Sequence, residues 1–301
     1  MDLDAFRRHG RAAVDWVADY LEGLEQRPVR AQVAPGDVDR GLAARAPETA
    51  EAVDAILADF ERIVLPGVTH WQHPRFFAYF PANASPPSVL AEILTAGIAA
   101  QCMLWQTSPA ATEMESRVLD WVRQAIGLPE GFTGVIQDSA STATLAALVA
   151  ARERALLGAG NADGLAHHGP VTVYATAEAH SSVEKACRIA GIGSRGLRHV
   201  ATDAAGRMEP GALAVEIARD RAAGLHPAAV VACLGSTGIG AIDPLAEIAA
   251  VARAEGLYLH VDAAWAGSAL LLDEWRWMIE GIAAADSFVF NPHKWLGAQF
   301  D

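Results

Sequence analysis

One lysine follows a short apolar strand, and we build the candidate chemistry around it. Lys294 lies within SFVFNPHKW, residues 287–295. Ser287–Phe290 favours a strand, and the proline two positions before the lysine disfavours helix just ahead of it, so we expect His293 and Lys294 to emerge on a loop at the strand end. Apolar neighbours desolvate a lysine, lower its pKa and favour attack of the neutral amine on a carbonyl group. A solvated surface lysine is the ordinary alternative.

A carboxylate and an imidazole also follow predicted strands. Asp262 ends the apolar run 258–261, and a carboxylate at the end of a buried strand is costly unless it meets a cation or hydrogen-bond donors. His180 follows the strand and turn of residues 174–179, where a neutral histidine in the core is the ordinary alternative. The carboxyl ends of parallel strands meet at one edge of a sheet, so we expect both side chains near Lys294.

Small hydroxylated residues precede a long helix in DSAST, residues 138–142. The free N–H groups and positive dipole at a helix start can bind an anion, and ordinary capping by Ser139 or Ser141 uses the same groups. With the amine, carboxylate and imidazole, this helix start completes the set that pyridoxal 5′-phosphate requires. The cofactor needs a lysine for its aldehyde, a carboxylate for its ring nitrogen, a flat group against its ring and a cradle for its phosphate.

Two glycine-rich segments match nucleotide-binding patterns but stand in the wrong context. Gly191–Gly196 fits G-x-G-x-x-G, yet it follows a predicted helix and precedes a strand, whereas the dinucleotide fingerprint needs the reverse order. We interpret it as a helix C-cap and turn. Gly235–Gly240 is separated from the next helix by the residues AIDP, so a dehydrogenase is only a remote alternative.

Hydrophobic periodicity predicts an α/β fold behind these residues. Short apolar strands alternate with helices from residue 134 onward, and residues 228–261 form a strand–helix–strand unit with parallel strands. The expected strands are 171–175, 228–234, 258–261 and 287–290, and the expected helices between them include 143–157, 181–190 and 245–254. Upstream helices are expected at 4–25, 48–63, 86–101 and 109–127. We divide the chain into a helical dimerisation segment, 1–85, and a cofactor-binding large domain, 86–301, because the first two helices cannot bury their apolar faces alone.

Composition narrows the class of protein. The chain has 301 residues, of which 52% are hydrophobic and 20% charged, as in ordinary globular proteins. A net charge of −13 argues against binding to nucleic acid or anionic lipid. Three widely spaced cysteines argue against a disulfide framework or a zinc cluster, and no signal peptide or membrane-spanning segment is evident. We expect a cytoplasmic protein without a metal site.

Longer segments give the chain a family resemblance. HPRFFAYFPA, SPAATEMES, DSASTATLAALVAAR, EAHSSVEKA, HVDAAWAGSA and FNPHKWLGAQFD resemble the pyridoxal-phosphate-dependent group II amino-acid decarboxylases, in particular the branch that acts on DOPA, tyrosine and tryptophan. The likeness extends over essentially the whole chain. It implies a carboxy-lyase of fold type I, similar to aspartate aminotransferase, with a mixed, mostly parallel sheet flanked by helices. It also implies a homodimer with active sites at the interface.

The resemblance further implies roles for individual residues. Lys294 would hold the cofactor's aldehyde, Asp262 would pair with the ring nitrogen, and His180 would stack on the ring and help to position the substrate carboxylate. The other cofactor contacts would come from Ala140, Ser141, Thr237, Ala264, Asn291 and His293. The substrate, a small aromatic amino acid, would lie against Trp71, Phe80 and Pro81, and segment 101–105 would reach the partner's pocket.

Two departures from the family pattern bear on activity. Ala82 stands where some relatives have threonine. Relatives also continue beyond the position of Asp301 through a mobile loop, whose tyrosine reprotonates the carbanion, and a small C-terminal domain, so we expect the C-terminal part of the fold to be missing.

Three hypotheses about function follow. The leading one is decarboxylation of aromatic L-amino acids to arylalkylamines and carbon dioxide. An aromatic acetaldehyde synthase, which oxidises the intermediate instead of protonating it, is the enzymatic alternative, and His180 slightly favours decarboxylation over it by resemblance. The third is a truncated binding or dimerising module without turnover.

Overall fold

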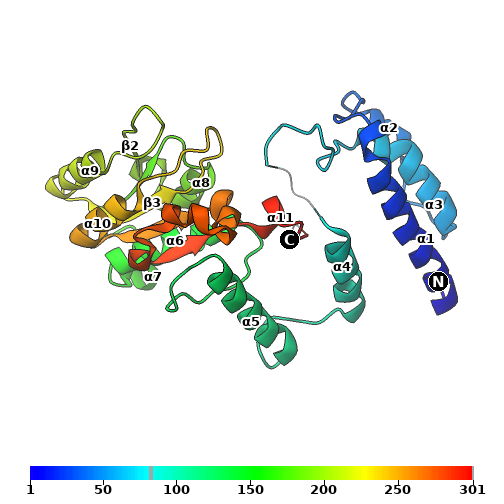
Figure 1. The fold of residues 1–301 in the computed structure, drawn as a ribbon, viewed down its shortest axis with the longest axis horizontal. Coiled ribbons are helices and arrows are strands. Elements are labelled where there is room, and N and C mark those ends of the chain that lie inside the picture. The colour runs from blue at the N-terminus through cyan, green and yellow to red at the C-terminus, as the bar shows by residue number, and fades with distance from the viewer. Residues whose placement is uncertain (81–83, 300–301) are drawn as a thin grey trace. The chain divides into compact units, whose positions relative to one another are not determined.

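Contacts within the chain divide it into two units, Met1–Asn83 and Ala84–Asp301. The structure, a computed structural model, describes residues 1–80 and 84–299 (Figure 1). The larger unit carries a β-sheet, whereas the smaller one is helical.

The larger unit is built on a parallel sheet of five strands. In chain order these are β1 (Val171–Thr176), β2 (Leu197–Val200), β3 (His226–Cys233), β4 (Tyr258–Asp262) and β5 (Ser287–Val289), and their order across the sheet is β2-β1-β3-β4-β5. Every residue of β1 is buried, as expected where helices cover both faces of a parallel sheet. The predicted strands are confirmed, and the parallel pairing of β3 with β4 confirms the unit predicted at 228–261.

Helices cover both faces of this sheet. One face carries α6 (Ala140–Ala155) and α8 (Ser182–Ile189), the other carries α9 (Pro210–Ala222) and α10 (Leu245–Glu255), and the short α7 (Ala159–Asp163) follows α6. Val231 of β3 belongs to the core under α6 and α8, whereas its neighbour Val230 belongs to the core under α9 and α10. Successive residues of the strand therefore face opposite cores, which is why these strands are continuous apolar runs.

The strand register brings the carboxyl ends of three strands to one edge. Cys233 at the end of β3 pairs with Asp262 at the end of β4, and Asp262 pairs in turn with Val289 of β5. The 3-10 segments η5 (Ala266–Leu271), η6 (Asp273–Ile279) and η7 (Ile282–Ala284) connect β4 to β5, and η4 (Ser194–Gly196) precedes β2. This edge is where ligand-binding side chains gather in α/β proteins.

The chain after β5 differs from the prediction. The expected loop is wrong, since His293 and Lys294 lie on a short helix, α11 (Pro292–Trp295). Pro292 occupies its first helical position, where the missing N–H of proline breaks no hydrogen bond. Pro292 therefore starts this helix. The residue before it, Asn291, is extended, as expected ahead of a proline.

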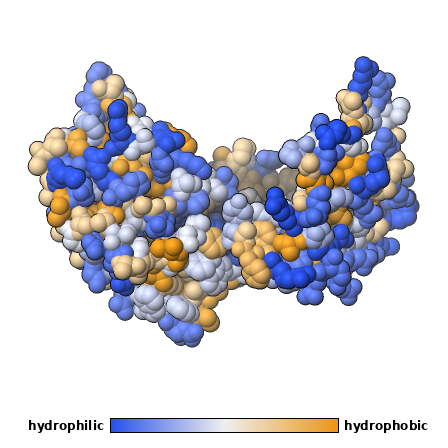
Figure 2. All heavy atoms as spheres, turned by 90° about the horizontal axis from the view of Figure 1, so that it is seen from above, coloured by the Kyte–Doolittle hydropathy of each residue, from blue (hydrophilic) through white to orange (hydrophobic). Residues whose placement is uncertain are grey.

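Two helices precede the sheet and expose apolar side chains. α4 (Pro86–Ile98) and α5 (Pro109–Ala125) each begin with proline after a serine, as predicted. The exposed hydrophobic residues on and between them include Leu90, Ile93, Leu94, Ile98, Met103, Leu104, Trp105, Val118 and Trp121. Figure 2 shows hydrophobic residues at the surface among hydrophilic ones. Exposed apolar residues in such number are typical of an interaction surface.

The smaller unit begins with α1 (Leu3–Glu22), which confirms the helix predicted at 4–25. The following elements are η1 (Leu24–Gln26), α2 (Asp37–Gly41), α3 (Val53–Asp59), the π-helical turn η2 (Phe60–Val64) and η3 (Leu65–Gly67). The helix predicted at 48–63 is wrong at its start, because α3 begins at Val53, the first partly buried residue after the exposed residues 48–52. Packing of apolar residues, rather than a proline ahead of them, decides where such a helix begins. No helix in the part of the chain that the structure describes is long and apolar enough to cross a bilayer.

Candidate active site

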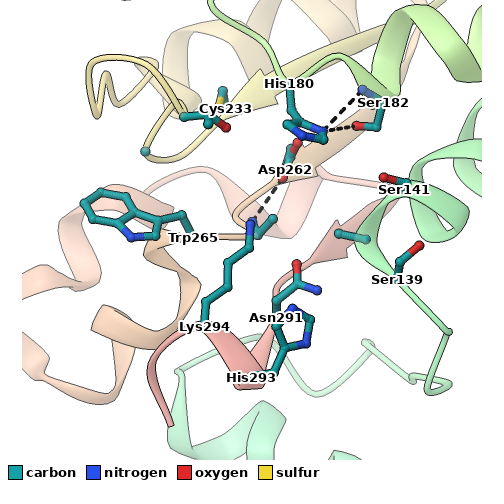
Figure 3. A pocket seen from close by; sticks show the side chains of 14 residues that line it. Ser139, Ser141, His180, Ser182, Cys233, Asp262, Trp265, Asn291, His293 and Lys294 are labelled. Atoms are coloured by element: carbon teal, nitrogen blue, oxygen red, sulfur yellow. Dashed lines mark hydrogen bonds between the residues drawn. The ribbon is translucent and has the colours of Figure 1, made fainter. Parts of the chain in front are cut away.

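A pocket lies at the sheet edge where β3 and β4 end (Figure 3). Its cavity has a volume of about 210 Å³. It is lined by every residue predicted to contact the cofactor: Ala140, Ser141, His180, Thr237, Asp262, Ala264, Asn291, His293 and Lys294. These residues come from the start of α6, from the last residue of β4 and from the segments that follow β1, β3, β4 and β5.

Lys294 and Asp262 form the charged centre of this pocket. Asp262 is only 5% exposed, and its Oδ1 accepts a hydrogen bond from the backbone nitrogen of Ala264 at 3.0 Å. The Lys294 side chain extends from α11 toward this carboxylate (Figure 3). Burial lowers the pKa of Lys294, while the negative charge of Asp262 acts in the opposite direction. The pocket therefore holds a partly desolvated amine with a larger neutral fraction than an exposed lysine has.

His180 is fixed in one tautomer by Ser182. The backbone N–H of Ser182 donates to Nδ1 of His180 at 3.2 Å, and the Ser182 hydroxyl lies 2.9 Å from the same nitrogen (Figure 3). Because an N–H group faces Nδ1, that nitrogen is an acceptor, and the neutral ring carries its proton on Nε2. Burial lowers the pKa of His180, with Asp262 opposing this effect and Lys294 adding to it. The alternative of a histidine enclosed in the core is wrong, since His180 is not among the buried residues and lines the pocket.

The start of α6 has the properties of an anion cradle. Ser139 is its N-cap, and the serine hydroxyl accepts a hydrogen bond from the backbone nitrogen of Thr142 at 3.2 Å. Ala140 and Ser141 occupy the first turn and line the pocket, where backbone N–H groups point out of the helix end. Capping by Ser139 and an anion site at the first turn are therefore compatible, because they use different N–H groups.

Two buried polar side chains close the far side of the pocket. Asn291 and His293 are both buried, and both line the cavity (Figure 3). The Asn291 Oδ1 atom is buried without a hydrogen-bond partner among the residues that the structure describes. Leaving a buried amide group unpaired is costly, so this side chain is satisfied best by a ligand in the cavity.

Several lining residues were not predicted from the sequence. Ser182, Cys233, Gly235 and Trp265 complete the pocket wall, together with Ser139 of the predicted helix start. The ring of Trp265 meets that of Trp295 edge to face, with centroids 5.3 Å apart. Cys233 could have been found from the pairing of its strand end with Asp262, whereas Ser182 is recognisable only once its helix start is placed beside His180.

The predicted substrate contacts belong to the smaller unit. There, the ring of Trp71 stacks on those of Phe76 and Tyr79, with centroids 5.1 Å and 5.6 Å away. Phe80 follows them in the chain, and Pro81 lies outside the described residues. All residues that line the pocket belong to the larger unit, so the roles of Trp71, Phe80 and Pro81 stay predictions.

The donors and acceptors of the pocket fit pyridoxal 5′-phosphate. An amine, a buried carboxylate, an imidazole and an anion cradle line one cavity. The buried Oδ1 atom of Asn291 has no hydrogen-bond partner among the described residues, which leaves it available to a ligand. Within residues 1–80 and 84–299, no group of three His, Cys, Asp or Glu side chains is placed to hold a metal ion. The chemistry of this donor set is that of a cofactor with an aldehyde, a basic ring nitrogen and a phosphate.

Comparison with known proteins agrees with this assignment. The pyridoxal-dependent decarboxylase conserved domain matches residues 35–301. The chain is 44% identical over 313 residues to aromatic-L-amino-acid decarboxylase of Mus musculus, and 43% identical over 309 residues to phenylacetaldehyde synthase of Arabidopsis thaliana. Both alignments cover 100% of this chain, but 65% and 62% of the respective relatives. The chain therefore spans less than two thirds of the length of these relatives.

Solved structures show the same fold. The structure of Oryza sativa TDC with PLP superimposes with a TM-score of 0.95 at 36% identity, over 100% of this chain and 66% of its own. The agreement includes the sheet and the helices that position the pocket. Since the family's conserved domain extends over most of the sequence and the fold is shared, this chain belongs to the pyridoxal-dependent decarboxylase family.

Proposed function

We propose that this protein decarboxylates aromatic L-amino acids to arylalkylamines and carbon dioxide with pyridoxal 5′-phosphate as cofactor. One observation carries the proposal: Lys294, its pKa lowered by burial, faces the buried carboxylate of Asp262 in a pocket that also contains His180. When bound, pyridoxal 5′-phosphate supplies an aldehyde that condenses with amines and a ring that accepts electrons from the bond that breaks.

Three parts of the pocket would hold the cofactor. The neutral amine of Lys294 would attach to the aldehyde and later give way to the amine of the substrate. Asp262 would keep a proton on the ring nitrogen, because a buried carboxylate stabilises a cation beside it. The first turn of α6, with Ala140 and Ser141, would bind the phosphate through N–H and hydroxyl donors. Thr237, Ala264, Asn291 and His293 would contribute the remaining contacts.

His180 would orient the substrate. Its Nδ1 is occupied by Ser182, so the proton on Nε2 is the hydrogen-bond donor that this ring offers to the pocket. A donor at that atom suits the carboxylate of an amino acid, which is the group released as carbon dioxide. The face of the ring would lie against the cofactor.

The aromatic class of substrate is supported by the relatives and by one aromatic cluster. Aromatic-L-amino-acid decarboxylase is among the relatives with 44% identity. The stacked rings around Trp71 are the kind of surface that would accept an aromatic side chain. The assignment of Trp71, Phe80 and Pro81 to substrate binding rests on the family resemblance of this segment.

An aromatic acetaldehyde synthase is the second candidate, favoured by the 43% identity to phenylacetaldehyde synthase. The two activities are separable by product. Incubation with tyrosine, tryptophan and DOPA should give one amine per carbon dioxide for a decarboxylase, and aldehyde, ammonia and hydrogen peroxide with uptake of oxygen for a synthase. Peroxide together with aldehyde would reject plain decarboxylation.

We also propose a homodimer in the cytoplasm. The exposed apolar residues of α4, α5 and the segment between them support association with a second copy, because a surface of this composition is typical of an interface. All three cysteines are free thiols, which supports a reducing compartment.

The cofactor assignment can be tested at single-residue resolution. The sequence has only two lysines, Lys294 in the pocket and Lys185, which is exposed on α8. Addition of pyridoxal 5′-phosphate should produce a visible absorption band, and borohydride should then fix the cofactor on the peptide that contains Lys294. The band should persist in Lys185→Ala and vanish in Lys294→Ala.

The same experiment addresses the hypothesis of an inactive module. The 301-residue chain and any longer form of the protein should be tested side by side. A wild type without the absorption band would contradict the cofactor assignment. Cofactor bound without amine or aldehyde from the longer form would favour a module without turnover.

A further inference from the structure

Behind the pocket, three polar side chains form one chain of hydrogen bonds. His260 of β4 is 1% exposed and Thr144 of α6 is 0% exposed. The imidazole Nδ1 of His260 lies 2.7 Å from Oγ of Ser287 in β5, and its Nε2 lies 3.4 Å from Oγ1 of Thr144. None of the three lines the pocket, yet burial of polar groups has a cost that an apolar core avoids.

The direction of each hydrogen bond in this series follows from its last acceptor, the backbone carbonyl of Ala140. The Thr144 hydroxyl donates its single hydrogen to the backbone carbonyl of Ala140, 2.8 Å away, because a carbonyl can only accept. Toward His260 this hydroxyl therefore accepts, so the imidazole donates from Nε2. Burial lowers the pKa of His260, and a neutral ring with its proton on Nε2 accepts from Ser287 at Nδ1.

These hydrogen bonds join three of the elements that carry the pocket, α6, β4 and β5. Ala140 opens α6 and lines the cavity. His260 stands two positions before Asp262, and so on the same face of β4. Ser287 pairs with His260 in the sheet and begins the strand that leads to Lys294. Hydrogen bonds are directional, whereas apolar contacts are not, so this link constrains the start of α6 relative to both strands.

We propose that His260 is a positioning residue for the anion cradle: it holds the first turn of α6 in place relative to Asp262 and Lys294, and thereby sets the affinity for the phosphate group of the cofactor. This inference rests on the proposed binding of pyridoxal 5′-phosphate. A histidine that only stabilises the core would affect ligands with and without a phosphate equally. His260 is expected to discriminate between them.

The test compares pyridoxal 5′-phosphate with pyridoxal, which lacks the phosphate. Equilibrium titration of the 301-residue chain, read from the visible absorption of lysine-bound ligand, gives a dissociation constant for each compound without any measurement of turnover. His260→Phe and Thr144→Val should weaken binding of pyridoxal 5′-phosphate about tenfold, because each removes a buried hydrogen bond. Affinity for pyridoxal should stay at the wild-type value. Thr144→Ser retains the hydroxyl and should bind pyridoxal 5′-phosphate with the wild-type affinity.

Two substitutions of the same kinds serve as controls. Thr172 is also 0% exposed, and its Oγ1 lies 3.0 Å from the hydroxyl of Tyr174, so Thr172→Val removes a buried hydroxyl away from the cradle. His199 is an exposed histidine on β2, so His199→Phe controls for loss of an imidazole. Neither should change the ratio of the two dissociation constants.

The possible outcomes separate this inference from the proposed function. Equal changes for both compounds, or no change for either, would overturn the role of His260 while leaving cofactor binding intact. Absence of binding of both compounds by the wild type would overturn the proposed function and this role together. If His260→Phe does not fold, Thr144→Val and Ser287→Ala test the two hydrogen bonds of His260 separately.

Discussion

Asp243 accepts a hydrogen bond from the backbone nitrogen of Cys233 at 2.7 Å, across the base of the loop that carries Thr237. Its second carboxylate oxygen accepts from the backbone nitrogen of Met208, also at 2.7 Å. An antiparallel bridge between Leu234 and Ile242 closes the same loop. A buried carboxylate outside the pocket therefore fixes one of the segments that line it.

The pH dependence of stability should report this carboxylate. Burial raises the pKa of Asp243 from 3.8 to about 6, so the folded protein binds this proton at a higher pH than the unfolded chain does. The resulting stabilisation is fully present below about pH 4 and is lost as the pH rises through about 6, a change of about 3 kcal/mol. Asp243→Asn cannot titrate, so the difference in free energy of unfolding, wild type minus variant, should fall between these pH values. Urea titrations at several pH values measure it, and a constant difference would contradict the assignment.

Loss of the Asp262 carboxylate should nearly abolish turnover. Asp262→Ala would leave the protonated ring nitrogen of the bound cofactor without its carboxylate partner. Breaking a buried ion pair of this kind costs about 3–5 kcal/mol. This corresponds to a decrease in kcat/KM of about 10²–10³-fold or more. Steady-state rates of amine formation from tyrosine, tryptophan and DOPA give the measurement. A near-normal rate would remove Asp262 from the proposed mechanism.

Ser182→Ala should affect substrate binding through His180. The backbone N–H still donates to Nδ1, so the tautomer is kept, but the contact with the hydroxyl at 2.9 Å is lost. We expect kcat/KM to decrease about fivefold, mostly through a higher KM, as for loss of one neutral hydrogen bond. Ser181→Ala is the control, because the Ser181 side chain makes no capping hydrogen bond. Equal kinetics of the two variants would argue against a role of the Ser182 hydroxyl.

The glycine of the HVDAAWAG segment should be required for steric reasons. A Cβ atom at Gly267 would lie 2.4 Å from Cβ of Phe290, so Gly267→Ala should lower the free energy of unfolding by about 1–3 kcal/mol. Gly211 in α9 has open space around the same position, and Gly211→Ala should stabilise by about 0.4–1 kcal/mol. Thermal unfolding of the two variants should therefore shift in opposite directions. Similar shifts for the two variants would show that the close approach of Phe290 does not require glycine at position 267.

Local sequence signals were sufficient for much of the fold. Continuous apolar runs marked the strands, and prolines and serines marked the starts of α4 and α5, because these signals act within a few residues. The start of α3 was misplaced, since residues 48–52 are exposed and Val53 is the first partly buried residue. α9 was not predicted, although Pro210 marks its start.

The site was predictable to the extent that it follows strand ends. Asp262 and Lys294 could be placed together because parallel strands end at one edge of a sheet. Ser182 and His260 could not, because their contacts depend on how α8 and α6 pack against that sheet. The chain through His260 in particular joins positions 116 residues apart, a relationship that no local pattern encodes.

The order in which the pocket residues occur along the chain has a consequence for biosynthesis. Ser139 and Lys294 line the same cavity but are 155 positions apart (294 minus 139). At the usual rate of translation, about 10–30 s pass between the emergence of the phosphate cradle and that of the lysine. The nascent chain cannot attach its cofactor covalently at Lys294 during that interval, so the segments of β1 to β4 are synthesised before the cofactor can be attached there.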